Sequence, residues 1–332
     1  MLAALVAVAL VLVAAAVVLG RTAQPSGRTV VTVRLWDQQV AAAYRESFAQ
    51  FTREHPDIEV HVNVVSYATY FDTLRTDVAG GGADDIFWIN NSYFAEYADN
   101  SRLMPIDPAP DWEPSVVDQF TRNGVLWGVP QLTDAGIALY YNADLLAADG
   151  VSPAELGDAR WDPDPAIDTL RPLLTRLTHG RQWGYNAAND LQGIYLNYIG
   201  SAGGAFTTGD RFAFDNPGAV TAFDYVVGLI NTDRVSPPAS DTNDNGDFSR
   251  NQFLAGRMAV FQSGTYNLAQ IAQQATFRWG VAMLPTGPAG RVSVTNGIVA
   301  AGNPASRNPA AVREVLAWLG GTRGNEFVGR HG

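Results

Sequence analysis

The sequence predicts an α/β fold in which helices cover a parallel sheet. Residues 58–64 strictly alternate apolar and polar side chains, which is the pattern of a strand. Residues 39–54 and 67–79 each place apolar side chains at the spacing of one helix face. The β-branched segment 30–36 and the apolar segment 85–89 complete the order β-α-β-α-β, which predicts parallel strands joined by right-handed crossovers.

The rest of the chain continues as mixed α/β. Residues 124–146 predict a strand, a polar turn, a second strand and a helix. A strand that ends at Ser263-Gly264 is followed by a helix, and 277–285 is predicted to form another strand. Further helices are expected at 166–178, 190–199, 217–231 and 308–321.

Composition limits the function classes. The 332 residues are 47% hydrophobic and 17% charged, which is typical of a globular protein long enough for two lobes. The net charge of −11 disfavours nucleic-acid binding. The chain has no cysteine, so disulfides, thiolate metal sites and cysteine nucleophiles are excluded, and its four histidines are scattered. We therefore expect neither a metal nor a cofactor.

The N-terminal segment indicates export. Residues 2–19 are 18 consecutive apolar residues, and the polar segment 22–29 follows as a linker. This length fits a signal peptide or a short membrane anchor, and a buried core helix is the alternative. We expect an exported protein at the extracytoplasmic face of the cell membrane, anchored by or cleaved after residues 2–19.

Polar and aromatic residues gather where two predicted parallel strands end. Ligands of open α/β sheets bind outside these carboxyl ends, so one edge of a cleft is expected there, suited to a neutral polar ring. Two other interpretations remain open, namely that the tryptophans are core residues and that the amides form a turn. Asp37 is also expected to cap a helix. The residues are Trp36, Asp37 and Gln38 after the first strand, and Trp88, Asn90, Asn91 and Ser92 at the third.

The order and spacing of several segments resemble the family 1 extracellular solute-binding proteins of bacterial ABC importers, the maltose-binding-protein-like group. The segments include LWDQQ, AGGGADDIFWINNSYFAEYADNSRLMPID, GVPQLTDAGIALYYNADLL, GSAGGAF, FLAGRMAVFQSGTY, WGVAMLPTGP and NPAAVREVLAWLGG. The resemblance implies a periplasmic-binding-protein type II fold, with two lobes, a ligand cleft and a hinge. The first lobe would comprise 30–134 and 297–332, and the second 135–296.

The resemblance also implies the function. Such a protein is not an enzyme, acts as a monomer, captures a sugar between its lobes and delivers it to the transmembrane subunits of an ABC permease. Besides the seven strand-end residues above, the site would draw on the hinge crossings and the second lobe. These residues are Gln131, Thr133, Asp134, Asn189, Ser263, Gly264, Tyr266, Asn296 and Gly297.

Several alternatives stay open. Proteins of this family continue for several helices beyond the segment that ends at Gly332, so we expect an incomplete second lobe, an exposed apolar patch and weak binding. A glycerophosphodiester or a polyol phosphate is an alternative ligand, and a receptor relic that no longer transports is an alternative role. A glycosidase is disfavoured because the adjacent Asp84 and Asp85 face opposite ways on a strand. Segment 241–252 resembles a calcium loop but has Gln252 where a bidentate glutamate is required.

Overall fold

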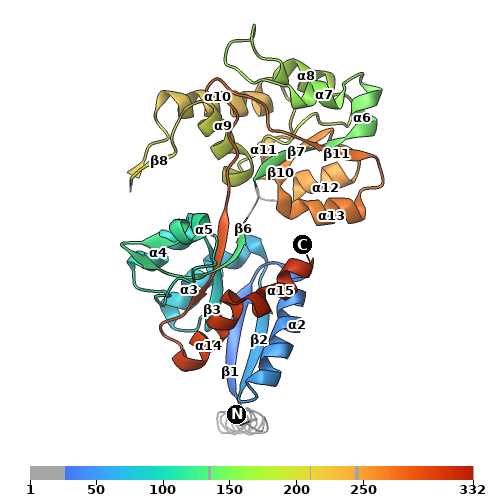
Figure 1. The fold of residues 1–332 in the computed structure, drawn as a ribbon. Coiled ribbons are helices and arrows are strands. Elements are labelled where there is room, and N and C mark those ends of the chain that lie inside the picture. Colours follow the sequence, from blue (N-terminus) through green and yellow to red (C-terminus); the bar gives the residue numbers. More distant parts are fainter. Residues whose placement is uncertain (1–26, 134–135, 210, 244–246, 332) are drawn as a thin grey trace, which may run out of the picture.

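The computed structural model describes residues 27–133, 136–209, 211–243 and 247–331. Figure 1 shows two lobes, one above the other, each built around its own sheet. Strand β6 (Val129–Thr133) belongs to the first sheet, and the next strand, β7 (Ile137–Asn142), belongs to the second. Strand β12 (Gly297–Gly302) then returns the chain to the first sheet. The chain therefore crosses between the two sheets twice.

The first sheet has five strands in the order β2-β1-β3-β12-β6. Its remaining strands are β1 (Thr29–Leu35), β2 (Ile58–Val64) and β3 (Ile86–Asn90). Strand β1 pairs parallel with both β2 and β3, whereas β12 is antiparallel to β3 and β6. Helices α2 (Gln38–Glu54) and α3 (Tyr67–Gly80) connect the three parallel strands. The predicted β-α-β-α-β order is therefore confirmed.

Helices cover this sheet with the apolar faces that the sequence pattern predicts. Tyr44, Phe48 and Phe51 of α2 are buried, as is Leu74 of α3. The predicted helix at 308–321 is present as α14 and buries its apolar face in the same core. The remaining elements of this lobe are α4 (Asn91–Asp99), α5 (Pro114–Gln119), β4 (Thr121–Arg122), β5 (Val125–Leu126), α14 (Pro309–Gly320) and α15 (Thr322–His331).

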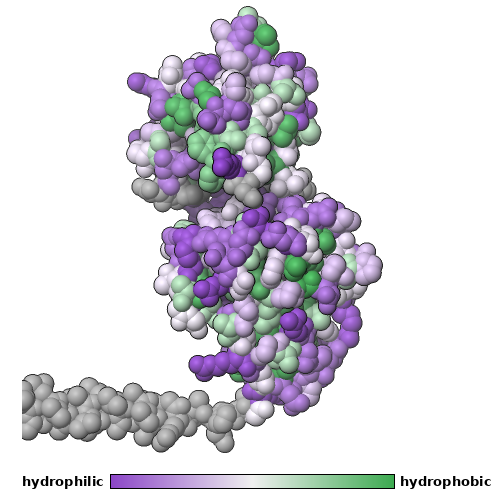
Figure 2. Space-filling view, turned by 90° about the vertical axis from the view of Figure 1, so that its left-hand side faces the viewer, coloured by the Kyte–Doolittle hydropathy of each residue, from purple (hydrophilic) through white to green (hydrophobic). Residues whose placement is uncertain are grey.

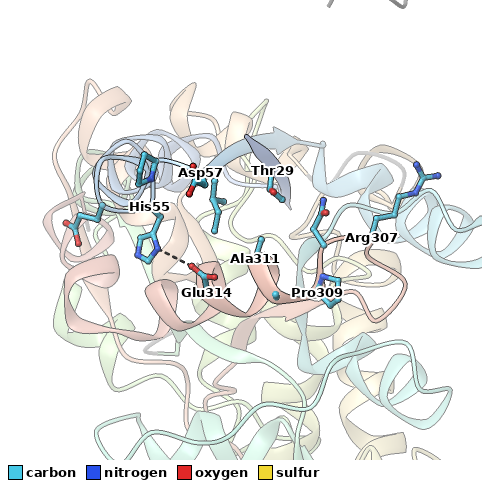
Figure 3. A pocket seen from close by; sticks show the side chains of 12 residues that line it. Thr29, His55, Asp57, Arg307, Pro309, Ala311 and Glu314 are labelled. Carbon is cyan, nitrogen blue, oxygen red and sulfur yellow. Dashed lines mark hydrogen bonds and ion pairs between the residues drawn. The ribbon is translucent and has the colours of Figure 1, made fainter. Parts of the chain in front are cut away.

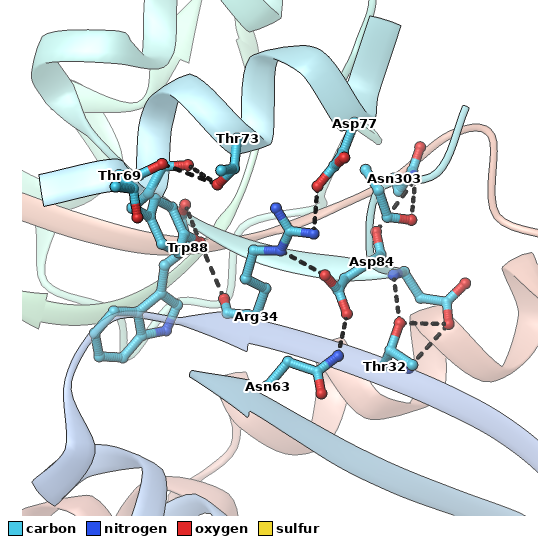
Figure 4. A network of polar contacts seen from close by, with 12 residues as sticks. Thr32, Arg34, Asn63, Thr69, Thr73, Asp77, Asp84, Trp88 and Asn303 are labelled. Carbon is cyan, nitrogen blue, oxygen red and sulfur yellow. Dashed lines mark hydrogen bonds and ion pairs between the residues drawn. The ribbon is translucent and has the colours of Figure 1, made fainter. Parts of the chain in front are cut away.

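A buried ion pair ties the parallel strands together (Figure 4). The Arg34 Nε of β1 donates to Asp84 Oδ2 at 2.5 Å, and its Nη2 donates to Asp77 of α3 at 2.7 Å. Asn63 of β2 donates to the other oxygen of Asp84 at 2.5 Å. Burying a charge is costly unless it is paired, so this network requires β1, β2, α3 and the segment just before β3 to keep their relative positions.

The second lobe is built on a three-stranded antiparallel sheet, β10-β7-β11. Its large side chains, including Trp161 and Tyr185, form a separate core. Its strands are β8 (Thr207–Thr208), β9 (Arg211–Phe212), β10 (Val260–Gly264) and β11 (Trp279–Ala282). Its helices are α6 (Ala143–Ala148), α7 (Pro153–Gly157), α8 (Leu170–Arg176), η1 (Leu191–Tyr195), α9 (Leu196–Ser201), α10 (Pro217–Asn231), α11 (Ala239–Thr242), α12 (Phe248–Leu254), η2 (Thr265–Asn267) and α13 (Leu268–Gln274).

Three elements of this lobe differ from the prediction. The helix expected at 166–178 is shorter, because the Asp168 carboxylate accepts the backbone N–H of Arg171 at 3.1 Å and fixes the start of α8. The helix expected at 190–199 begins with one π-helical turn, η1. The strand expected at 277–285 is limited to β11, where it pairs with β7. The extent of β11 depends on its partner β7, which lies far away in the sequence, whereas the start of α8 is fixed by the nearby Asp168.

Candidate functional site

The carboxyl ends of β1, β2 and β3 form one rim of the first lobe, which faces the second lobe in Figure 1. Trp36 and Asp37 follow β1, and both are half-buried. Asp37 caps α2, because its Oδ1 accepts the N–H groups of Gln39 at 2.8 Å and Val40 at 2.9 Å. The predicted N-cap is therefore confirmed. Gln38 is exposed at the start of the helix.

Trp88 lies beneath this rim. Its exposed fraction is 0%, and its Nε1 donates to the Tyr44 hydroxyl at 3.0 Å. The Trp36 ring packs edge-on against it, with 5.0 Å between the ring centroids. Trp88 is therefore a core residue, the alternative that the sequence left open. The half-buried Trp36 above it is the tryptophan that reaches the rim.

A chain of hydrogen bonds links Trp88 to the first crossing between the lobes. The Tyr44 hydroxyl, which accepts from Trp88, donates to Gln131 Oε1 on β6. Burial raises the pKa of Tyr44 well above its ordinary value, so this hydroxyl keeps its proton and acts as a donor. Gln131 Nε2 in turn donates to the carbonyl of Pro130 at 2.7 Å. Gln131 thus supports the strand that leads to the second lobe.

The three polar residues at the end of β3 have different surroundings. Asn90 is buried at the N-cap position of α4, and its Oδ1 has no hydrogen-bond partner among the described residues. Asn91 and Ser92 are exposed in the first turn of α4, and Asn91 Nδ2 donates to Gln119 Oε1 at 3.2 Å. The pair Asn90-Asn91 therefore starts a helix rather than forming an isolated turn.

The two crossings lie side by side where Gly297 of β12 pairs with Thr133 of β6. A side chain at Gly297 would lie 2.8 Å from the Phe120 ring, so the close approach requires glycine. Asn296 is buried, and its Nδ2 donates to Gln192 Oε1 of the second lobe at 3.2 Å. Its Oδ1 has no partner within the described part of the chain. Asp134, the remaining predicted hinge residue, lies outside the described residues.

The second lobe presents the carboxyl end of β10 to these crossings. Gly264 pairs with Ile137, the first residue of β7 after the first crossing. Ser263 and Gly264 are buried, whereas Tyr266 is 50% exposed and its hydroxyl accepts from Ser263 Oγ at 3.3 Å. The Tyr266 ring lies over Gly264, where any side chain would collide with it. Asn189 is also exposed, just before η1.

A buried glutamine positions η1 against β10. Gln262 Nε2 donates to the carbonyl of Gly193 at 2.7 Å, and Asp190 Oδ1 accepts the N–H of Gly193 at 2.8 Å. Both bonds engage the π-helical turn that carries Gln192. Local π-helical geometry is often found at functional sites, because it reorients one side chain within a helix. Here it accompanies the contact between Gln192 and Asn296.

Two residues of this region were not predicted. Tyr67 follows β2, is 55% exposed and lies 5.5 Å from Trp36 between ring centroids. Because β2 is parallel to β1, its end reaches the same rim, and that signal was available in the sequence. Gln192 had no such signal. None of the rim residues named above is basic. Among the named rim residues that the structure describes, Asp37 is the acidic one.

A cavity lies elsewhere on the first lobe. Its volume is about 570 Å³, and it opens near the amino end of β1, between α2 and α14 (Figure 3). Thr29, His55 and Glu314 line it, and His55 Nδ1 lies 3.1 Å from Glu314 Oε2. This depression is at the opposite end of β1 from Trp36, so it is separate from the rim. Within the described ranges, no cluster of three potential metal ligands occurs, and no helix has the length and apolar character needed to cross a membrane.

Comparison with known proteins identifies the family. The model of the bacterial extracellular solute-binding protein family matches residues 36–326. A probable ABC transporter-binding protein of Deinococcus radiodurans is 28% identical over 235 residues, which are 68% of this chain and 54% of the relative. The chain thus spans about half the length of that relative.

Solved structures agree with this assignment. UspC of M. tuberculosis is 69% identical, with a TM-score of 0.70, over 91% of this chain and 80% of UspC. Maltose-bound MalE3 of T. maritima is 22% identical, with a TM-score of 0.74, over 90% and 78% of the two chains. UgpB of Mycobacterium tuberculosis in complex with glycerophosphocholine is 20% identical, with a TM-score of 0.74, over 90% and 77%. The last two show the fold alone, which is that of type II periplasmic binding proteins. This chain belongs to the bacterial extracellular solute-binding protein family.

Proposed function

We propose that this protein is the extracytoplasmic sugar-binding subunit of an ABC importer. The observation that carries the proposal is the pair of rims joined by two adjacent crossings. One rim presents Trp36, Asp37 and the start of α4, and the other presents Tyr266 beside the end of β10. A ligand between these rims would contact both lobes at once.

The chemistry of the rims suits an uncharged, hydroxyl-rich ring. An aromatic face covers the C–H face of a sugar, and amides or carboxylates bridge neighbouring hydroxyls. Asn91 and Ser92 are exposed in the first turn of α4 and offer an amide and a hydroxyl group to such a ligand. A phosphate has no basic partner among the named rim residues. We therefore favour a sugar over a glycerophosphodiester or a polyol phosphate.

Closure of the two lobes would couple binding to transport. A ligand shifts the protein toward a closed form only to the extent that it binds that form better than the open one. Contacts to residues of both rims provide this difference in affinity, because in the open form the ligand contacts only one rim at a time. The closed surface would then be recognised by the transmembrane subunits of the permease. We propose that the protein acts as an exported monomer at the extracytoplasmic face of the membrane.

Binding without catalysis fits the carboxylates of the first lobe. Asp84 is engaged by Arg34 and Asn63 (Figure 4), and Asp85 accepts from the Thr32 N–H at 2.9 Å and from Ser306 Oγ at 2.5 Å. Both precede β3 and so lie at the opposite end of this strand from Asn90. The adjacent acidic pair therefore serves the structure of the lobe, which argues against a glycosidase.

Thermal denaturation with a panel of candidate ligands tests the proposal. A ligand at 100 times its Kd adds about 2.7 kcal/mol to the free energy of unfolding. We expect stabilisation by at least one saccharide in a panel of mono- and disaccharides that includes maltose, and none by glycerophosphocholine. Product analysis after prolonged incubation should recover the saccharide intact. Turnover of the sugar, or stabilisation by glycerophosphocholine alone, would contradict the assignment.

A further inference from the structure

We propose that Trp36 and Tyr67 form an aromatic corner on the first lobe that selects ring-closed saccharides. This inference rests on the proposed function and adds to it a specificity residue, Tyr67, on a strand end that the sequence pattern did not single out. The corner is defined by these two side chains alone.

The corner arises from strand register. Leu35 of β1 and Val64 of β2 are paired in parallel, so the residues that follow them leave the sheet at the same edge. The N–H of Val65 still donates to the carbonyl of Leu35 at 3.0 Å, which holds the two exits together. Trp36 follows immediately on one strand, and Tyr67 opens α3 after the other.

The two rings meet at a steep angle. Their centroids are 5.5 Å apart, and their planes are inclined by 68°. Trp36 is held from below by Tyr70, at 4.9 Å, and by Trp88, at 5.0 Å between centroids. Tyr67 also packs edge-on against Phe71 at 6.0 Å, yet 55% of its surface remains exposed. A buried aromatic floor therefore fixes the geometry of a half-open pair of rings.

Such a corner favours a rigid ring as its occupant. A pyranose or furanose can pack its C–H face on one aromatic ring while its edge meets the other, and an open-chain polyol loses conformational entropy in doing so. The capping carboxylate of Asp37, next to Trp36, adds an acceptor for a hydroxyl at the ring edge.

A quaternary ammonium group is the competing occupant, since aromatic faces also attract cations. In a glycerophosphodiester that cation is joined to a phosphate. None of the rim residues named above is basic, so the phosphate would find no charged partner among them to offset its lost hydration. We therefore assign the corner to a saccharide and make glycerophosphocholine the second arm of the test.

Tyr67 is the residue to substitute. Trp36 packs on the buried Tyr70 and Trp88, whereas Tyr67 is more than half exposed. Isothermal titration would compare the protein with its Tyr67→Ala and Tyr67→Phe variants, using the saccharide of the panel that stabilises the protein most, with maltose included. We expect Tyr67→Ala to weaken binding about tenfold or more, and Tyr67→Phe to stay within about threefold. Phe212→Ala is the matched control, because Phe212 is 73% exposed on the β8–β9 hairpin of the second lobe.

The outcomes separate the inference from the proposed function. Saccharide binding that is unchanged in Tyr67→Ala would overturn the corner and leave the sugar-binding function intact. Tight binding of glycerophosphocholine that Tyr67→Ala abolishes would show that the corner takes a cation, which overturns both. Failure of the unmodified protein to bind any saccharide of the panel would also overturn both. An equal loss in Phe212→Ala would mean that the effect is not local to the corner.

Discussion

Replacing Trp88 with alanine should destabilise the first lobe rather than remove a ligand contact. Trp88 is 0% exposed, and truncating a buried tryptophan costs about 3–5 kcal/mol. The Tyr44 hydroxyl would also lose the hydrogen bond that it accepts from Trp88 Nε1 at 3.0 Å. Taking about 4 kcal/mol and roughly 2–4 °C per kcal/mol for a unit of about 150–250 residues, we expect the melting temperature to fall by about 8–16 °C.

Thermal unfolding followed by circular dichroism measures this shift, and titration of the folded fraction at low temperature measures binding. Tyr67→Ala is the matched control, because the Tyr67 side chain is more than half exposed and the loss of its ring contacts with Trp36 and Phe71 should cost only about 1–2 kcal/mol. Suppose instead that Trp88→Ala melted like the unmodified protein and lost its ligand. Trp88 would then be a contact residue, and the packing described for the rim would be wrong.

Three further predictions concern the charges of the two lobes. Arg34→Met leaves Asp84 buried without its cation and should lower the free energy of unfolding, measured by chemical denaturation, by about 3–5 kcal/mol. The control is Arg75→Met, which removes an exposed ion pair with Glu96, and an equally small loss of stability in both variants would refute the prediction. Burial raises the pKa of Asp168 above its unfolded value, so the folded state binds more protons, and the stability this carboxyl contributes is lost as pH rises through the folded pKa. The stability of the protein relative to Asp168→Asn should therefore fall between pH 4 and pH 7, and a rise over that interval would contradict the burial argument. Millimolar calcium should leave the melting temperature unchanged, because Gln252 cannot act as a bidentate carboxylate; a calcium-dependent increase would disprove this interpretation of 241–252.

The regular part of the first lobe was predictable because its signals are local. Alternation at 58–64 and the helix stripe with Tyr44 and Phe51 depend on neighbours within a few residues, and they gave β2 and α2 almost to the residue. The parallel pairing follows from the general packing of β-α-β units, whereas the order β2-β1-β3 was not predicted. The position of the rim then follows from the direction of the parallel strands.

The fate of the two tryptophans was not predictable from the pattern. Trp36 and Trp88 both end apolar strands, and the sequence offered core and ligand roles for each. Strand β3 pairs with β12 on one side and with β1 on the other, so Trp88 is enclosed by elements from both ends of the chain. Trp36 lies one residue beyond the end of β1, at the edge of the sheet where the strands end, and remains half-buried. The difference is one of tertiary context, which local spacing does not encode.

The contacts between the lobes were also beyond local reasoning. Gln192 meets Asn296 across more than a hundred residues, and the π-helical turn that carries Gln192 is held by Gln262 from a third segment. A helical pattern at 190–199 gives no reason for the extra residue in that turn. Tyr67 differs from these cases, because the parallel partnership of β2 with β1 already placed it at the rim.

The distance between the lobes, with and without a saccharide, tests the central claim most directly. The chain has no cysteine, so Ala49→Cys on α2 and Gln273→Cys on α13 introduce a single pair of spin labels at exposed positions on opposite lobes. In Figure 1 these helices lie on the same side of the molecule. We predict that a saturating saccharide, shown by titration to bind, shortens the distance between the labels. An unchanged distance with the saccharide bound would contradict capture between two closing lobes.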